Sequence, residues 1–325
     1  MHFIDAATTR RHLGFDALIA ALRAMFVAGC EVPLRHTHRI TAAGDAPGEG
    51  GTVLLMPAWR TGARLGLKTV TIFPGNSAQG LPGLHSTYLL FDANTGEPLA
   101  QIDGNEITAR RTAAASALAA SFLARADAHR LLVVGAGRVA SLLAEAMHAV
   151  RPIDEVTVWS RRAESAQQLA ARLRQQGLAA HAVTELAQAT AQADIISCAT
   201  LSTAPLIRGE WLREGSHLDL IGSFTPAMRE TDAACFARCA VFVDTLEALQ
   251  KSGDVLQAIQ AGAFDATRLR GTLAELCAGT CAARVSATQC TLFKSVGSAL
   301  EDLAAAELVF DAVAGAASSG KRSDA

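Results

Sequence analysis

The sequence lacks the features of nucleic-acid-binding, membrane and secreted proteins. The formal net charge is only −2 and the pI is about 6.5, so no strong field attracts nucleic acid or an anionic membrane. No stretch reaches eighteen uninterrupted apolar residues. The start, Met-His-Phe-Ile-Asp, has no basic region followed by a long apolar run. We therefore expect a cytoplasmic protein that binds neither nucleic acid nor membrane.

The cysteine pattern also lacks the spacings of common metal and disulfide sites. Seven cysteines leave at least one unpaired in any disulfide scheme, and disulfide frameworks are typical of much smaller secreted chains. No Cys-x-x-Cys or His-x-x-x-His spacing occurs, and His36 and His38, which would share one face of a strand, have no accompanying carboxylate. Cysteines four residues apart can share a helix face, as in Cys235 with Cys239 and Cys277 with Cys281. A zinc site stays an alternative, but we expect buried structural thiols and no metal.

The length allows two domains with separate cores, because the chain has 325 residues and half of them are hydrophobic. The first third predicts a packing helix at 16–27 and a loop rich in glycine, proline and acids at 44–51. A β-meander follows, with strands expected at 52–57, 65–73, 87–91 and 98–103 and a tight turn at 92–96. An alanine-rich helix at 108–126 then leads into the second part of the chain.

The run Leu-Leu-Val-Val-Gly-Ala-Gly-Arg-Val-Ala at 131–140 predicts a buried parallel strand that ends in a phosphate-binding loop. Gly135 allows the tight turn, Gly137 lets the backbone approach a pyrophosphate, and Ala140 replaces the third glycine of the dinucleotide fingerprint. A helix at 139–150 would aim its free N–H groups at the phosphates. The alternative is that the glycines serve only packing. We expect the loop residues that bind the cofactor to be Gly135, Ala136, Gly137, Arg138 and Val139.

A second strand at 155–159 arrives about twenty residues later, where a ribose-reading residue is expected. Its tip carries Ser160, Arg161 and Arg162 instead of the usual Asp or Glu. Two guanidinium groups suit a 2′-phosphate better than a bare ribose, so these residues favour NADPH, with NADH as the alternative cofactor. The other interpretation is that both arginines are solvated residues that open the next helix.

The alternation of strands and helices continues with helices at 164–176 and before 193 and strands at 180–183, 194–199, 217–221 and 240–244. Ligands bind outside the carboxyl ends of such parallel strands, so Thr200 should lie near the nicotinamide. A long helix at 295–314 should pack back on the N-terminal part. We therefore predict an N-terminal domain at 1–126, a Rossmann domain at 127–294 and a C-terminal segment at 295–325.

Three basic residues of the first domain are candidates for substrate binding. Lys68 alternates with apolar neighbours along a strand, so its ammonium should point to an inner face or a cleft, where it needs an anionic partner such as a substrate. Arg35 and Arg111 can supply forked donors for a carboxylate. The alternative is that all three are surface charges. His85, at the start of a strand, is a candidate for substrate contact or proton transfer, although a structural histidine is the favoured interpretation.

Five ordered motifs resemble the ornithine cyclodeaminase/mu-crystallin family along nearly the whole chain. They are Lys-Thr-Val-Thr-Ile-Phe-Pro-Gly-Asn at 68–76, Thr-Gly at 95–96, Ile-Thr-Ala-Arg-Arg-Thr-Ala-Ala-Ala-Ser at 107–116, the glycine loop and Phe-Lys-Ser-Val-Gly at 293–297. The resemblance implies an α/β fold in which a Rossmann dinucleotide-binding domain is inserted into a second α+β domain for substrate binding and dimerisation. It implies a homodimer, and it places the family's substrate-carboxylate and catalytic residues on Arg35, Lys68 and Arg111, with Lys68 orienting the substrate carboxylate.

The family includes cyclodeaminases, alanine dehydrogenases, ketimine reductases and binding proteins, so membership does not fix the reaction. In the cyclodeaminases and alanine dehydrogenases an aspartate lies beside the substrate amine, whereas Phe224 takes its place here. Asp219, five residues earlier, cannot be assumed to substitute. The run His-Leu-Asp-Leu-Ile-Gly-Ser-Phe-Thr-Pro-Ala-Met-Arg-Glu at 217–230 resembles the branch that reduces cyclic ketimines.

The resemblance therefore implies NAD(P)H-dependent reduction of a small cyclic imino acid. The reactions are Δ1-pyrroline-2-carboxylate to L-proline and Δ1-piperideine-2-carboxylate to L-pipecolate. An ornithine cyclodeaminase, a mu-crystallin-like protein that binds NADPH and a small ligand, and, more weakly, an alanine dehydrogenase are the alternatives.

Overall fold

The computed structural model describes residues 1–41 and 50–320, which form two compact units. The terminal domain comprises Met1–Arg111 and the chain from Ser298 onward, and the inserted domain comprises Thr112–Gly297. The predicted boundaries, after 126 and after 294, differ because the division falls inside helix α3 (Gly104–Leu123) and at the start of the last helix. Most of the loop expected at 44–51 lies outside the described residues.

The terminal domain contains a six-stranded sheet in the order β1-β6-β5-β4-β3-β2. All neighbours are antiparallel except β1 and β6, which are parallel. The expected meander is confirmed, whereas the three-residue β1 is too short to give an alternating pattern. The strands are β1 (His2–Ile4), β2 (His36–Ile40), β3 (Gly51–Trp59), β4 (Arg64–Ile72), β5 (Leu84–Asp92) and β6 (Pro98–Asp103).

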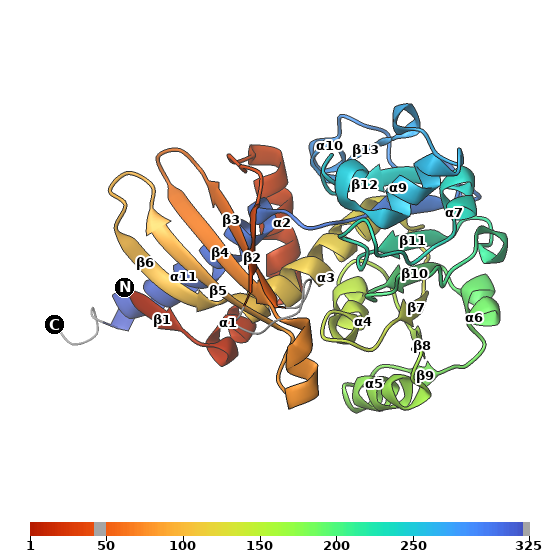
Figure 1. Cartoon of the computed structure of the whole chain (residues 1–325), viewed down its shortest axis with the longest axis horizontal. Coiled ribbons are helices and arrows are strands. Elements are labelled where there is room, and N and C mark those ends of the chain that lie inside the picture. Colours follow the sequence, from red (N-terminus) through yellow and green to blue (C-terminus); the bar gives the residue numbers. More distant parts are fainter. Residues whose placement is uncertain (42–49, 321–325) are drawn as a thin grey trace. The chain divides into compact units, whose positions relative to one another are not determined.

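Helices cover one face of this sheet. Helix α11 (Ala299–Gly320) packs on β3, β4 and α2 (Phe15–Ala28), and α1 (Ala6–His12) packs on α11 and β6. Figure 1 shows α11, in blue, lying across the strands of this domain. Along β4 the buried residues Gly66, Lys68 and Val70 alternate with half-buried ones, so Lys68 points to the face that the helices cover.

The inserted domain contains eight parallel strands in the order β13-β12-β14-β11-β10-β7-β8-β9. They are β7 (Arg130–Val134), β8 (Glu155–Trp159), β9 (Ala180–Ala182), β10 (Ile195–Cys198), β11 (His217–Leu220), β12 (Ala240–Val243), β13 (Gly271–Thr272) and β14 (Thr291–Lys294). The chain moves outward from β7 first to β8 and later to β10, so the strand order reverses beside β7. This is the Rossmann arrangement expected from the sequence, with its switch point at the carboxyl ends of β7 and β10.

Short helices connect these strands, and α4, α5 and α6 follow the predicted pattern (Figure 1). They are α4 (Ala140–His148), α5 (Ala163–Gln175), α6 (Leu186–Gln192), α7 (Ala233–Arg238), α8 (Ala248–Lys251), α9 (Gly253–Gln260) and α10 (Leu273–Ala278). The sequence does not predict α7, α8, α9, α10, β13 or β14, because these elements have at most eight residues each.

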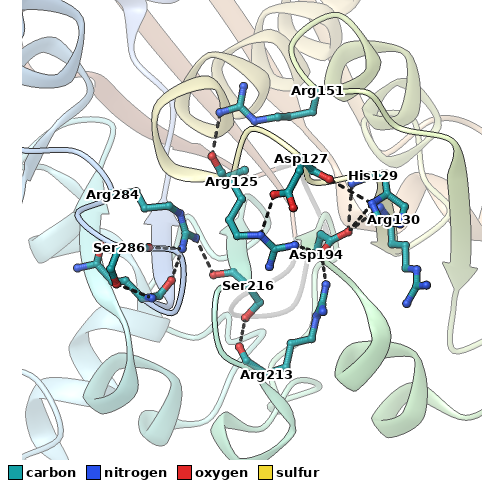
Figure 2. Close-up of polar contacts among 12 residues, drawn as sticks. Arg125, Asp127, His129, Arg130, Arg151, Asp194, Arg213, Ser216, Arg284 and Ser286 are labelled. Carbon is teal, nitrogen blue, oxygen red and sulfur yellow. Dashed lines mark hydrogen bonds and ion pairs between the residues drawn. The ribbon is translucent and has the colours of Figure 1, made fainter.

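One buried carboxylate organises the amino edge of the parallel sheet (Figure 2). Asp194, 2% exposed and directly before β10, accepts hydrogen bonds from the backbone N–H groups of His129 and Arg130 at the start of β7. The guanidinium groups of Arg125 and Arg213 bind the same side chain. Because this cluster fixes the amino ends of β7 and β10, the opposite edge of the sheet is left for the ligand loops.

Candidate active site

A cavity of about 300 Å³ lies at the carboxyl ends of β7, β8 and β10 in the inserted domain. Seven of the nine residues predicted to bind the cofactor line it, whereas Arg138 and Val139 do not. Its lining residues are Gly135, Ala136, Gly137, Trp159, Ser160, Arg161, Arg162, Ala199, Thr200, Leu201, Ser202 and Leu206. The structure therefore brings the glycine loop, the tip of the second strand and Thr200 to one place.

The glycine loop has the shape that a dinucleotide requires. Gly135 has a φ of 121°, its N–H donates to the carbonyl oxygen of Trp159 (2.8 Å), and an added Cβ would lie 2.6 Å from the Ala199 oxygen. Only glycine fits this turn. At Gly137 an added Cβ would meet no atom within 4 Å, so the backbone is open where a pyrophosphate would approach. The residues present thus fit a dinucleotide, with α4 following the loop.

Arg161 and Arg162 lie just after β8, beside the cavity. Both side chains are exposed and both border the cavity. Arg162 is also the N-cap residue of α5 and makes no side-chain capping bond. The arginines therefore open the next helix and at the same time present two cations beside the cavity.

Glu230 joins two of the loops at this edge of the sheet, and the sequence analysis does not single it out. It is fully buried, and its Oε1 accepts from the N–H (2.7 Å) and hydroxyl (2.8 Å) of Thr200, after β10. Its Oε2 accepts from the N–H of Gly222 (2.8 Å), after β11. Burial and the nearby Asp254 raise the pKa of Glu230 to about 7, against the opposing effects of Lys294 and the hydrogen bonds from Thr200. Glu230 is therefore a positioning residue for the two loops.

Phe224 and Asp219 have different surroundings, although both lie in the same run. Phe224 is half-buried and packs on an apolar cluster of Val243, Ala248 and Val296. Asp219 lies inside the sheet on β11, fully buried, and accepts hydrogen bonds from the hydroxyl groups of Ser116 (3.0 Å) and Ser197. Asp219 is therefore occupied within the core and does not replace a carboxylate at the Phe224 position.

In the terminal domain, Lys68 and Arg111 meet two acidic residues of α11. Lys68 Nζ lies 2.6 Å from Asp302 Oδ2. Arg111 donates through Nε to Asp302 Oδ1 and through Nη1 to Glu301 Oε2, both at 2.8 Å. All four residues are buried, Lys68 to 1% and Arg111 to 7% exposure. The interpretation of Lys68 and Arg111 as surface charges is therefore wrong, and the anionic partner of Lys68 in the structure is Asp302.

Burial and ion pairing shift the pKa values of the residues in this cluster to different extents. Burial lowers the pKa of Lys68 to about 8, and the neighbouring Arg111 adds to this shift while Asp302 opposes it. Burial acts against the charged forms of Arg111 and Asp302 too, but their ion pairs outweigh it, so the pKa of Arg111 is raised and that of Asp302 is lowered. Lys68 is therefore the member of the cluster suited to exchanging a proton near neutral pH.

The structure places Arg35 near this cluster and His85 away from it. Arg35 directly precedes β2. The first residue of β2, His36, pairs with Leu55 of β3, and the residue that follows Leu55 pairs with Lys68 of β4. Arg35 thus lies at the level of Lys68, with β3 between them. On β5, Tyr88 pairs with Lys68 and is buried, whereas His85, three residues earlier, is exposed and points to the other face. His85 therefore does not join Lys68.

Three functional candidates in this domain are missing from the sequence analysis. Glu301 and Asp302 are two acids in an otherwise apolar helical stretch, and this was a usable signal, because buried acids need cations. Tyr88, the single tyrosine of the chain, is 1% exposed, and its hydroxyl has no hydrogen-bond partner within the described ranges 1–41 and 50–320. Nothing in its sequence context distinguishes it from a core residue.

The described residues contain neither a metal-binding cluster nor a membrane-spanning helix. Across 1–41 and 50–320, no group of three or more His, Cys, Asp or Glu side chains is placed to hold a metal ion. In the same ranges, no helix combines the length and apolar character that crossing a membrane requires. His36 and His38 do share one face of β2, with stacked rings 6.5 Å apart.

Comparison with known proteins decides the family. The sequence model of the ornithine cyclodeaminase/mu-crystallin family matches residues 6–317. The chain belongs to this family. It is 43% identical to the Δ1-pyrroline-2-carboxylate reductase of Paracoccus denitrificans over 269 residues, which cover 82% of this chain and 84% of the relative. The resemblance to the reductase branch of the family is thereby confirmed.

Two solved structures of family-like proteins share the fold. The Δ1-pyrroline-2-carboxylate reductase of Thermococcus litoralis, in complex with NADH and L-proline, has a TM-score of 0.90 and 31% identity and covers 96% of this chain and 97% of its own. An archaeal alanine dehydrogenase dimer with bound NAD has a TM-score of 0.88 and 27% identity over 96% of this chain and 95% of its own. The predicted fold class, with its Rossmann domain, is confirmed.

Proposed function

We propose that this family member reduces cyclic ketimine carboxylates with NADPH. The products would be L-proline from Δ1-pyrroline-2-carboxylate and L-pipecolate from Δ1-piperideine-2-carboxylate. The observation that carries the proposal is Phe224, because its ring packs on an apolar cluster where a carboxylate would be needed to hold a substrate amine. The 43% identity to a relative named as such a reductase supports the same reaction.

The cofactor would be held by the inserted domain. Gly135, Ala136 and Gly137 would cradle the pyrophosphate, and Thr200, fixed by Glu230, would lie on the nicotinamide side. Arg161 and Arg162 would pair with the 2′-phosphate, which favours NADPH over NADH. When bound, the reduced nicotinamide supplies the hydride that passes to the imine carbon.

The substrate would be held by the basic residues of the terminal domain. Arg35 and Arg111 would bind the substrate carboxylate, and the pair of acids on α11 fixes the direction of the Arg111 guanidinium. An imine accepts hydride well only when its nitrogen is protonated, because the developing negative charge is then neutralised. Lys68, with a pKa of about 8, would orient the substrate and keep that proton in place. His85 has no role in this proposal.

A homodimer is part of the proposal. The face of the terminal sheet opposite the helices carries half-buried apolar side chains, among them Leu55, Leu67, Leu89 and Phe91. A second copy of the chain would cover this face. The alanine dehydrogenase with the same fold is described as a dimer, which supports this assembly.

Assays of the purified chain test the proposal directly. NADPH oxidation would be followed by absorbance with each cyclic imine, beside ornithine plus NAD with ammonia detection. We expect rapid NADPH consumption with an imine and no ammonia from ornithine. Ammonia release would mean a cyclodeaminase, and binding of NADPH without turnover in either assay would mean a ligand-binding protein.

A further inference from the structure

Two cysteines lie side by side at the amino edge of the parallel sheet. Cys239 directly precedes β12 and Cys290 directly precedes β14. The two strands pair with Ala240 opposite Thr291, and the N–H of Ala240 donates to the carbonyl oxygen of Cys290 (2.9 Å). Cys239 is itself extended, with φ −101° and ψ 154°. The register therefore continues one residue outward and places Cys239 next to Cys290.

This placement suits a disulfide bond. Neighbouring parallel strands lie about 5 Å apart, and side chains opposite each other in register point to the same face. A disulfide joins Cα atoms roughly 4.4–6.8 Å apart, and the spacing of neighbouring strands falls within this range. The two thiols already interact with each other. No disulfide joins them in the structure.

A cavity of about 760 Å³ gives solvent access to the pair. Cys239 and Cys290 both line it and are 6% and 7% exposed. Three exposed arginines, Arg238, Arg268 and Arg270, line the same cavity, against a single acidic residue, Glu214. A small molecule that carries carboxylates would therefore be drawn to the two sulfur atoms.

The two thiols differ in acidity, and the difference assigns their roles. Interactions with the Cys239 thiol, Ser216 and Arg238 stabilise the Cys290 thiolate. They outweigh burial, which disfavours the thiolate, and lower the pKa of Cys290 to about 5. The S–H group of Cys290 also reaches the carbonyl oxygen of Arg213 (3.1 Å). Contact with Cys290 and burial raise the pKa of Cys239. Cys290 is thus the nucleophile and Cys239 the resolving thiol.

We propose that Cys239 and Cys290 are a redox-active dithiol that a small anionic disulfide oxidises within the arginine-lined cavity. The Cys290 thiolate attacks one sulfur of the disulfide, forms a mixed disulfide and releases one thiolate. Cys239 then loses its proton to solvent, attacks the sulfur of Cys290 and releases the second thiolate. In sum, two protein thiols become one disulfide and the small disulfide becomes two thiols.

The dithiol is separate from the proposed cofactor site. All strands of this sheet are parallel, so the amino ends of β12 and β14 lie at the edge opposite the glycine loop. The disulfide would close a loop that contains residues 240–289. Asp244 lies within this loop, and its side chain accepts hydrogen bonds from the N–H groups of Val296 and Gly297 (both 2.7 Å). Because the cross-link restricts the unfolded chain, oxidation should raise the melting temperature of the protein.

Glutathione disulfide is the probe for the test. The full chain would be reduced, incubated with the probe at neutral pH, alkylated and digested for peptide mass spectrometry. We expect the Cys239 and Cys290 peptides to be joined with the loss of two hydrogens, and a higher melting temperature. Adducts on the half-buried Cys30 or Cys281, with Cys239 and Cys290 still alkylated as free thiols, would overturn the proposal.

Single variants separate the two steps. Cys239→Ser should stop the reaction at a glutathione adduct on Cys290, whereas Cys290→Ser should leave Cys239 unmodified. Cys30→Ser and Cys281→Ser are the matched controls and should leave the cross-link unchanged. An adduct on Cys239 in the Cys290→Ser variant would refute the assignment of the nucleophile. The wild-type measurement decides the main claim even if a variant fails to fold.

Discussion

Lys68 Nζ lies 2.6 Å from Asp302 Oδ2 in an interior where neither side chain is more than 1% exposed. Each side chain neutralises the buried charge of the other. Arg111 and Glu301 extend the pair to a group of two basic and two acidic side chains with no net charge. Removing one partner of a buried pair leaves an uncompensated charge, which costs about 3–5 kcal/mol of stability. The pair is therefore a structural element, and through Lys68 it is also part of the proposed substrate site.

The acidity of Lys68 predicts a pH limit for imine reduction. Its pKa of about 8 means that the ammonium is present at neutral pH and is lost as the pH rises through 8. We expect kcat/KM for the imine to fall above that pH and Lys68→Met to lower kcat by about 100-fold or more. The measurement is a pH–rate profile of both proteins, with NADPH binding as the control. A fully active Lys68→Met variant would remove this residue from the site.

Arg161 and Arg162 should determine the choice between the two nicotinamide cofactors. Changing both to Ser removes two charged donors, each worth roughly 1.5–3 kcal/mol toward a phosphate oxygen. KM for NADPH should therefore rise at least about 10-fold, and KM for NADH should change little. Arg172→Ser changes an exposed arginine in the last turn of α5, at the end away from Arg162, and is the matched control. Equal effects on NADPH and NADH would refute the role in phosphate binding.

Glu230 should couple cofactor affinity to pH. Its carboxylate accepts hydrogen bonds from both loops, and its pKa of about 7 means that this acceptor is weakened as the pH falls below neutrality. KM for the cofactor should then rise. Glu230→Gln should raise KM at every pH and abolish this dependence, while kcat changes less. A variant that keeps the wild-type pH dependence would show that Glu230 does not position the loops.

Phe224→Asp tests whether the aromatic side chain at this position determines which reaction is catalysed. A carboxylate placed against Val243, Ala248 and Val296 would be poorly solvated, so both stability and imine reduction should fall. Phe224→Leu keeps the apolar contact and should retain most of the rate. Steady-state rates with the imine and ornithine, together with thermal melts, compare the two variants. If Phe224→Asp leaves imine reduction and ligand preference untouched, Phe224 does not determine the reaction.

Local features of the molecule were predictable from the sequence. The strand, glycine loop and helix around Gly135 use residues that are adjacent in the chain, so composition and spacing predict them together. Alternation along β4 likewise predicts that Lys68 points inward. The pairings were not predictable. The acid at Asp302 signals a buried charge, but Asp302, Glu230 and the Cys239–Cys290 pair meet their neighbours only through sheet register and packing. The family resemblance supplied Arg35 and Arg111 without showing that Asp302 and Glu301 hold Arg111.

Transfer of a deuterium label tests the proposed function most directly. The enzyme would be incubated with Δ1-pyrroline-2-carboxylate and NADPH deuterated at one of the two C4 positions of the nicotinamide, and the proline formed would be analysed by mass and by chirality. The proposal predicts L-proline with one deuterium at Cα from one of the two labelled cofactors and none from the other. Proline without deuterium from either cofactor, or NADPH oxidation without proline, would contradict it.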